Sequence, residues 1–184
     1  MKRFVIMTVG KTHSEKSTFA GELNKELKGS FVMDQDNHAG FIHTYYEALQ
    51  PVSGPNTLKH GLSKYIVEYA KENTSLHMII CNSNLSRKDR DYLLNELFPS
   101  EDFFRIMVHF QIPDSILEAR AAESNRSTNI FRNAATFKEV LERQQAARRE
   151  DPAEDEADYL FVIKNNEEAG SVIREIVKLS EQFY

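Results

Sequence analysis

The sequence predicts an α/β fold in which helices cover both faces of an open, doubly wound, five-stranded parallel sheet. Five short, mainly apolar runs with high β-propensity are spread along the 184 residues, at 4–9, 31–34, 77–81, 104–110 and 159–163. Apolar runs of this kind are typical of parallel strands that are buried on both faces. Helical patterns alternate with them, at 17–28, 57–73, 86–97, 113–123, 136–150 and 167–183. This alternation indicates right-handed βαβ units.

The composition fits one globular domain over residues 1–184, with 41% hydrophobic and 28% charged residues. The formal net charge of −5 argues against a surface that neutralises long nucleic acid. A single cysteine, Cys81, cannot form a disulfide framework and fits a reducing compartment. No apolar run reaches the roughly 18 residues that a membrane span needs. We therefore expect a cytoplasmic protein that makes no use of a membrane.

The first strand leads into VGKTHSEKSTFA, at 9–20, which contains two lysines that each precede a hydroxyl residue. A phosphate-binding loop of the form GxxxxGK(S/T) joins a strand to a helix, so that backbone N–H groups and the helix dipole point at one anion. Counting six residues on from Gly10 reaches Lys16, whereas counting six back from Lys11 reaches Val5, inside the strand. The spacing therefore selects Lys16 and leaves Lys11 as an ordinary loop residue.

The selected loop assigns a role to each of its last residues. Lys16 would bridge the β and γ phosphates, Ser17 would bind Mg²⁺, and the Thr18 N–H would help to hold the α phosphate. The alternative is an ordinary helix capped by serine, with a solvated lysine. Glu15 stands where the pattern has glycine, at a cost of roughly 1 kcal/mol if this position has positive φ. The nucleotide-binding residues predicted in this loop are Gly10, His13, Ser14, Glu15, Lys16, Ser17 and Thr18.

Polar residues follow each of the other strands, at the edge where ligands bind in open α/β sheets. After the second strand, Asp34 and Asp36 leave the sheet beside the phosphate loop. Asp36 lies further out, so we expect it to accept a proton from a substrate hydroxyl or to bind Mg²⁺. Asp34 and His38 are candidates for the substrate side. The alternative for this stretch is an Asx-turn or a helix cap.

The third and fifth strands are followed by uncharged polar residues. Cys81 and Asn82 stand where phosphate-loop proteins usually have a carboxylate that orders Mg²⁺. Ser83 and Asn84, which come next, are candidates for hydrogen bonds to a substrate. After the fifth strand, Asn165 and Asn166 are candidate donors to a purine ring, although an Asn-Asn pair is also an ordinary turn.

Arginines spaced by six residues follow the fourth strand, at 120, 126 and 132. This spacing does not form a single helical stripe, and it favours a lid over 120–150 that folds over the phosphates. Arg120 is assigned to nucleotide binding, and Arg126 to stabilisation of the charge that develops in transfer. The alternative is a solvated basic surface, which we expect for Arg143, Arg148 and Arg149.

The six histidines show no HxxxH or HxH spacing and have no cysteine partner. We therefore expect no histidine metal site. His77 and His109 lie within predicted strands, so we expect both to be satisfied core residues.

Taken together, five motifs resemble the P-loop kinases, a group that includes polynucleotide kinases and related small-molecule kinases. The motifs are GKTHSEKSTFA, QDN, IICNSNLSRKDR, IPDSILEAR and EADYLFVI, and they span nearly the whole chain. The resemblance implies ATP and Mg²⁺ as cofactors, the sheet order 2-3-1-4-5, and an arginine-bearing lid. The residues that match the pattern are Lys16, Ser17, Asp36, Ser83, Asn84, Arg120 and Arg126.

Three positions depart from that pattern. Glu15 replaces the loop glycine, Cys81-Asn82 carries no carboxylate, and Ala39 stands where an arginine often follows the base. Each departure weakens one element of the site: the phosphate cradle, the Mg²⁺ site or the hold on the substrate.

The sequence therefore predicts a kinase that moves the γ phosphate of ATP to a hydroxyl of a small molecule. The stretch 37–75 is expected to form the acceptor pocket, because its aromatic and amide side chains suit a ring or a polar small molecule. These side chains are Phe41, His43, Tyr45, Tyr46, Asn56 and His60. Two alternatives stay open: a nucleotide-binding module without turnover, and a kinase for 5′-hydroxyl ends of polynucleotides.

Overall fold

The structure, a computed structural model, describes residues 2–131, 134–147 and 150–182. Arg132, predicted in the lid, lies outside the described residues, as do Arg148 and Arg149. Within the described ranges, no helix is both long and apolar enough to cross a membrane.

The sheet confirms the predicted strands and their order. Its five strands are all parallel, in the order β2-β3-β1-β4-β5. They are β1 Arg3–Gly10, β2 Ser30–Asp34, β3 His77–Cys81, β4 Phe103–Phe110 and β5 Tyr159–Ile163. Asp34 pairs in register with Cys81, and Phe110 pairs with both Gly10 and Ile163. Strands β1, β4 and β5 therefore end level with one another, and β2 and β3 end level about two residues earlier, so the residues that follow the strands meet at one edge.

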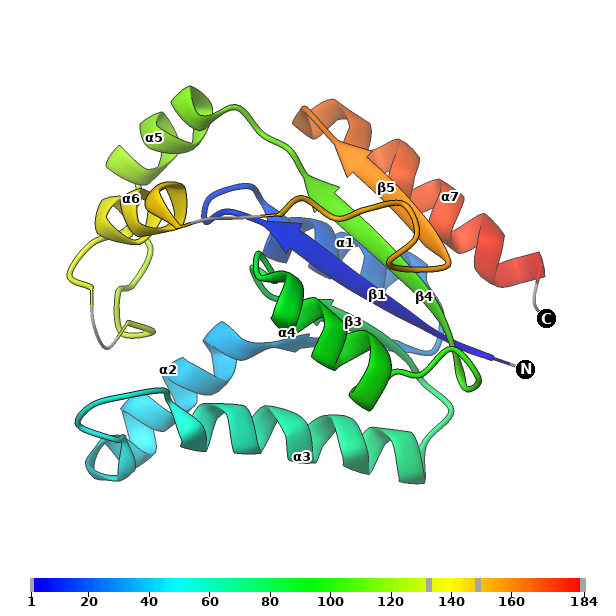
Figure 1. The fold of residues 1–184 in the computed structure, drawn as a ribbon, viewed down its shortest axis with the longest axis horizontal. Coiled ribbons are helices and arrows are strands. Elements are labelled where there is room, and N and C mark those ends of the chain that lie inside the picture. Colours follow the sequence, from blue (N-terminus) through cyan, green and yellow to red (C-terminus); the bar gives the residue numbers. More distant parts are fainter. Residues whose placement is uncertain (1, 132–133, 148–149, 183–184) are drawn as a thin grey trace.

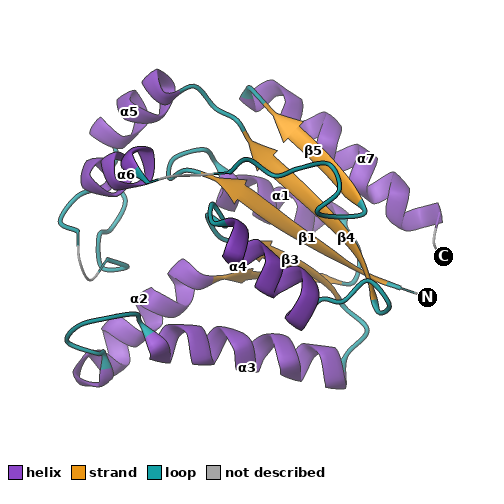
Figure 2. Ribbon diagram, viewed as in Figure 1, coloured by secondary structure: helices purple, strands orange, loops and turns teal. Residues whose placement is uncertain are grey.

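Six of the helices correspond to predicted ones: α1 Lys16–Glu26, α3 Thr57–Asn73, α4 Arg87–Tyr92, α5 Asp114–Ala122, α6 Phe137–Ala146 and α7 Ala169–Gln182. A π-helical turn, Leu93–Leu97, continues α4, and short 3₁₀ turns occur at Glu47–Leu49 and Asn166–Glu168. One helix, α2 Gln35–Tyr46, was not predicted, because its polar first turn and Gly40 obscure the apolar period (Figure 2).

The core lies on both faces of the sheet, as the doubly wound prediction requires. Along β1, Phe4 and Ile6 pack into one buried cluster with residues of α1 and α7. Val5 and Met7 point the other way, into a second cluster with residues of α3 and of the helix formed by α4 and its π-helical turn. Figure 1 shows α1 behind the sheet, α4 in front of it, and α5 and α6 beyond the carboxyl ends of β1 and β4. The sheet thus presents its carboxyl edge to α5 and α6.

The two strand histidines are buried, as predicted, and His77 is hydrogen-bonded. The backbone N–H of Phe4 donates to His77 Nδ1 at 3.0 Å. His109 Nε2 lies 3.6 Å from the carboxylate of Asp151.

A buried ion pair, which the sequence did not predict, joins α4 to the segment before β5. Arg90 Nε donates to Glu156 Oε2 at 2.7 Å, and neither side chain is more than 1% exposed. The same guanidinium donates to the carbonyls of Asn84 and Leu85, at 3.3 and 3.2 Å. The pair therefore also fixes the loop that leaves β3 at the carboxyl edge.

Candidate active site

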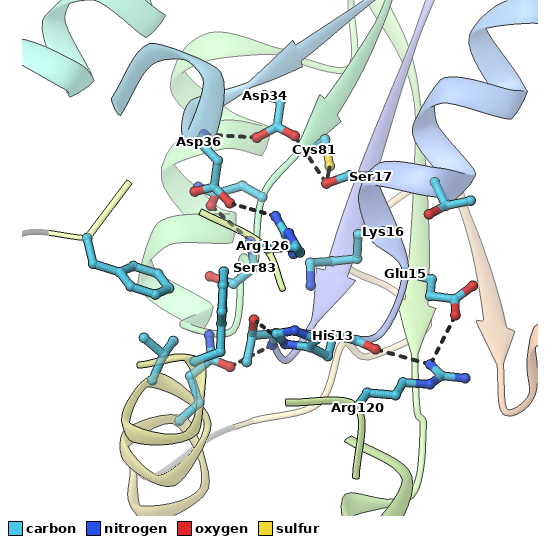
Figure 3. Close-up of a pocket in the computed structure, with 17 residues that line it drawn as sticks. His13, Glu15, Lys16, Ser17, Asp34, Asp36, Cys81, Ser83, Arg120 and Arg126 are labelled. Atoms are coloured by element: carbon cyan, nitrogen blue, oxygen red, sulfur yellow. Dashed lines mark hydrogen bonds and ion pairs between the residues drawn. The ribbon is translucent and has the colours of Figure 1, made fainter. Parts of the chain in front are cut away.

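The loop between β1 and α1 is built as a phosphate loop that closes around Lys16. A side chain at position 10 would lie 2.9 Å from Phe110 Cβ and from Ser14 Oγ, so only glycine fits there. Lys16 Nζ donates to the Lys11 carbonyl at 2.5 Å and contacts Ser14 Oγ at 3.2 Å. Lys11 itself turns away and pairs with Asp114. The structure thus places the Lys16 ammonium, and not that of Lys11, inside the loop (Figure 3).

Two residues of this loop take the left-handed conformation that favours glycine. Glu15 has φ 68° and ψ 24°, and His13 has φ 60°. Each costs roughly 1 kcal/mol relative to an ordinary backbone. The Glu15 carboxylate points away from Lys16 and lies 3.5 Å from Arg120 Nη1, which also donates to the His13 carbonyl at 3.1 Å. The loop therefore keeps its shape without glycine at either position, and the strain at His13 was not foreseen.

A cavity of about 480 Å³ opens above this loop, at the carboxyl edge of the sheet. Its described lining carries three cations, on Lys16, Arg120 and Arg126, and three carboxylates, on Glu15, Asp34 and Asp36. The predicted residues that line it are His13, Glu15, Lys16, Ser17, Thr18, Asp34, Asp36, Ser83, Arg120 and Arg126. Side chains from β2, the phosphate loop, α1, the β3–α4 loop and the segment after β4 therefore share one cavity, where charges of both signs face each other.

The two aspartates after β2 have different partners. Asp34 Oδ1 accepts from the Asp36 N–H at 2.9 Å and so caps α2, while its Oδ2 accepts from Ser17 Oγ at 3.1 Å. The cap interpretation therefore applies to Asp34, and Ser17 does not cap α1. Asp36 Oδ2 lies 3.9 Å from Arg126 Nη2. Burial, and next the charge of Asp34, raise the pKa of Asp36.

The donors beside Lys16 fit a magnesium ion that keeps most of its own shell. The Ser17 hydroxyl and the Asp34 carboxylate are hard oxygen donors in mutual contact, and Mg²⁺ takes few protein ligands besides water and phosphate. The sequence paired Ser17 with Asp36 for this role, but the contact is with Asp34. In the described chain, no three His, Cys, Asp or Glu side chains form a metal-binding cluster.

Burial controls the charges at the centre of the cavity. It is the largest cause that lowers the pKa of Lys16 to about 8, and the nearby carboxylates of Asp36 and Asp34 offset it only in part. Burial also raises the pKa of the Cys81 thiol to about 11, so the last residue of β3 brings no charge. A bound anion would favour the charged form of Lys16 and so raise its pKa again.

Four predicted site residues turn their side chains elsewhere. Ser14 is buried and donates to the Lys11 carbonyl at 2.8 Å. His38 Nδ1 lies 2.7 Å from Ser63 Oγ on α3, and the Asn84 amide donates to the Thr8 carbonyl at 2.9 Å. Asn165 caps the 3₁₀ turn that follows β5 and donates to Glu168 at 2.8 Å. These side chains therefore do not line the main cavity.

A smaller hollow lies between the phosphate loop and the start of the last helix. Glu15 and Thr18 line it from one side, and Asn166 and Ala169 from the other. Of the two asparagines expected as donors after β5, Asn166 therefore lines this hollow and Asn165 does not.

The lid helix α6 contacts the phosphate loop through residues that the sequence did not single out. Gln144 Oε1 accepts from the Thr12 N–H at 2.7 Å. The rings of His13 and Phe137 meet edge to face at 4.7 Å, and the Arg126 guanidinium lies 5.0 Å above the Phe137 ring. The helical spacing of 137, 140, 141 and 144 was the available signal, because it marks the face of α6 that packs inward.

The aromatic residues expected in the acceptor pocket are mostly exposed. Phe41, Tyr45 and Tyr46 form a surface cluster on α2, with ring centroids 5.3 and 5.5 Å apart. Asn56 caps α3 and lines a hollow next to the main cavity. This outcome corrects the expectation for the aromatics, which α2 turns outward.

Comparisons with known proteins identify the fold. Neither a protein-family model nor a curated protein matches the sequence. A sugar kinase from Janibacter sp. HTCC2649 is similar in structure, with a TM-score of 0.62 and 19% identity over 97% of this chain and 94% of that one. A gluconokinase from Sinorhizobium meliloti 1021 has a TM-score of 0.57 and 18% identity, over 100% of this chain and 98% of that one. A shikimate kinase from Bacteroides thetaiotaomicron has a TM-score of 0.56 and 12% identity, over 97% of this chain and 98% of that one. The chain therefore has the fold of the P-loop small-molecule kinases.

Proposed function

We propose that this chain is an ATP-dependent phosphotransferase that moves the γ phosphate to a hydroxyl group of a small molecule. One observation supports this most strongly: Lys16 and Ser17 face Asp34 and Asp36 across a single cavity, beneath the arginines of the lid. Phosphoryl transfer needs this combination, in which cations hold the phosphates and a carboxylate lies near the attacking hydroxyl.

In the proposed reaction, the backbone N–H groups of the loop and the Lys16 ammonium hold the phosphates of ATP. The acceptor oxygen forms a bond to the γ phosphorus, and the bond from that phosphorus to the β–γ bridging oxygen breaks. Asp36 accepts the proton of the hydroxyl, and ADP leaves with the electron pair. The raised pKa of Asp36 makes it a stronger base than an ordinary carboxylate.

Two further groups complete the site. Arg120 and Arg126 extend from the segment after β4 toward the cavity, where a guanidinium stabilises charge on the transferred group. Ser17 and Asp34 would hold Mg²⁺, which neutralises phosphate charge when it is bound.

The nature of the neighbours supports a small acceptor. The similar structures include a gluconokinase and a shikimate kinase, whose names specify small molecules with hydroxyl groups. The balance of three cations and three carboxylates in the cavity does not favour a polynucleotide end.

A nucleotide-binding module without turnover is the second candidate. It is favoured by Glu15, which adds a carboxylate to the loop, and by Asn82, which stands where a carboxylate would order the metal. Calorimetry with ATP and Mg²⁺ separates the two: binding without acceptor-dependent ADP release supports the module.

The test of the kinase is acceptor-dependent ADP release by wild type and by variants. Lys16→Ala and Asp36→Asn should each abolish it, whereas Lys11→Ala should not, because the Lys11 side chain pairs with Asp114 outside the cavity. If Lys16→Ala and Asp36→Asn turned over at the wild-type rate, the assignment would be wrong.

A further inference from the structure

A second hollow, of about 320 Å³, adjoins the phosphate cavity. It lies between the start of α3, which contributes Asn56 and Lys59, and the lid helix α6, which contributes Arg143. It shares Phe131, Val140 and Gln144 with the phosphate cavity. The two spaces are therefore adjacent, so an elongated ligand can contact the lining of both.

The charge of this hollow differs from that of the phosphate cavity. Its described lining carries two cations, Lys59 and Arg143, and no carboxylate. The remaining described lining is polar at Asn56 and Gln144 and otherwise apolar. The cations come from elements that are far apart in sequence, so a bound anion would join α3 to the lid.

The hollow also lies on the side of the proposed base. Burial is the main cause that raises the pKa of Asp36, and among the cations that oppose it Lys59 has the largest effect. The phosphate cavity, which Asp36 lines, and the hollow, which Lys59 lines, also share part of their walls. A molecule with its hydroxyl at Asp36 therefore has Lys59 within reach.

The start of α3 adds to the positive potential there. The helix runs from Thr57 to Asn73, and Asn56 caps it by accepting from the Lys59 N–H at 3.2 Å. The macrodipole of a helix favours negative charge near its N-terminus. The dipole and the two side chains therefore act in the same direction on a bound anion.

We infer that the acceptor is an anionic alcohol, whose carboxylate, phosphate or sulfate group binds Lys59 and Arg143 while its hydroxyl faces Asp36. This inference rests on the proposed function and names the substrate class of that site. Ala39 stands where the kinase pattern often has an arginine, and it provides no charge. On this inference, the cations on the substrate side come from α3 and α6 instead. Arg143, which the sequence left as a solvated helix charge, becomes a binding residue.

The experiment compares acceptors that differ only in the anionic group. The pairs are gluconate with sorbitol, shikimate with methyl shikimate, and glycerol 3-phosphate with glycerol. Each is tested for ADP release with ATP and Mg²⁺, and for direct binding by saturation-transfer NMR with a non-hydrolysable ATP analogue present. We expect at least one anionic member to bind and to react, with its neutral partner at least roughly 10-fold weaker.

The variants locate the anion. Lys59→Gln and Arg143→Gln should each raise the KM of that acceptor roughly 10- to 100-fold, because a hydrogen bond to a charged group is lost. Lys59→Arg, which keeps the charge, should restore most of the affinity. The matched control is Lys138→Gln, because Lys138 lies on the same helix α6 but pairs with Glu142 at the surface.

The outcomes distinguish this inference from the proposed function. If a neutral alcohol reacted as well as its anionic partner, in a manner dependent on Lys16 and Asp36, the kinase would stand and the inference would fall. An unchanged KM in Lys59→Gln and Arg143→Gln would have the same meaning. The failure of every anionic member to bind would overturn the inference alone, and the kinase would then be judged by the Lys16 and Asp36 variants. Binding of an anionic member without any phosphate transfer would support the inference and count against the kinase.

Discussion

Replacing Glu156 with glutamine should lower the free energy of unfolding of this protein by more than most substitutions of a single polar side chain. The substitution keeps the volume of the side chain, so it leaves no cavity. It removes the negative charge that faces the Arg90 guanidinium, where the Nε–Oε2 and Nη2–Oε1 distances are 2.7 and 3.0 Å. The arginine would then remain buried without its counter-ion.

The expected loss is large because both partners are out of water. Removing one partner of a buried ion pair typically costs about 3 to 5 kcal/mol, against a total stability of about 5 to 15 kcal/mol for a domain. Arg90 keeps its hydrogen bonds to the carbonyls of Asn84, Leu85 and Glu150. We therefore expect the lower end of that range, about 3 kcal/mol.

Urea unfolding followed by circular dichroism measures this loss, with Asp158→Asn as the control. Asp158 pairs with Arg105 at 3.2 Å, but these side chains are 31% and 16% exposed, so its loss should stay near or below about 1 kcal/mol. If Glu156→Gln lost no more free energy of unfolding than the control, the pair would not stabilise the fold as argued.

The same pair predicts a dependence on pH. Burial raises the pKa of Glu156, but the hydrogen bonds from Arg90 and Ala153 and the charges of Arg90 and Arg87 outweigh it, so the pKa is lowered overall. A lowered folded-state pKa stabilises the protein above the ordinary value of 4.5, and this contribution is lost as the pH falls through the folded value. Acid should therefore destabilise wild type more steeply than Glu156→Gln.

Two further predictions concern the phosphate loop. Glu15→Gly should leave the melting temperature within a few degrees of wild type, since relief of about 1 kcal/mol of strain is offset by the greater freedom of the unfolded chain. It should bind ATP more tightly in calorimetry, because a carboxylate leaves the site and Arg120 is released; weaker binding would contradict this explanation. For wild type, ATP affinity should fall as the pH rises past the Lys16 pKa of about 8, because the ammonium becomes neutral, and a flat titration through that range would show that Lys16 carries no such shift.

Much of the fold could be predicted because each strand is an uninterrupted apolar run. The strand runs and the helical periods between them are local features of the sequence, and the observed sheet confirms the strands that they predict. Helix α2 was not predicted because its first turn is polar, and because the Asp34 side chain both caps the helix and accepts a hydrogen bond from Ser17. A cap and a catalytic carboxylate look the same in sequence.

The parts of the site that could not be predicted depend on contacts between distant segments. Gln144 reaches Thr12 across 132 positions, and Arg90 reaches Glu156 across 66. Neither contact is marked by a motif, because an amide on an exposed-looking helix has many possible partners. Conversely, Asn84 and His38 are polar residues at positions where a ligand contact was expected. In the structure, each side chain contacts another residue of the fold instead.

The left-handed residues of the phosphate loop bear on how such loops are recognised. Patterns for these loops are written in residue types, and glycine stands in them as a proxy for a backbone angle. Here Glu15 reaches that angle without glycine, so a pattern written in letters rejects a loop that one written in dihedral angles would accept. A catalogue of phosphate loops collected by shape would therefore contain chains that alphabetic searches overlook, and it would show how often nature retains the geometry after losing the glycine.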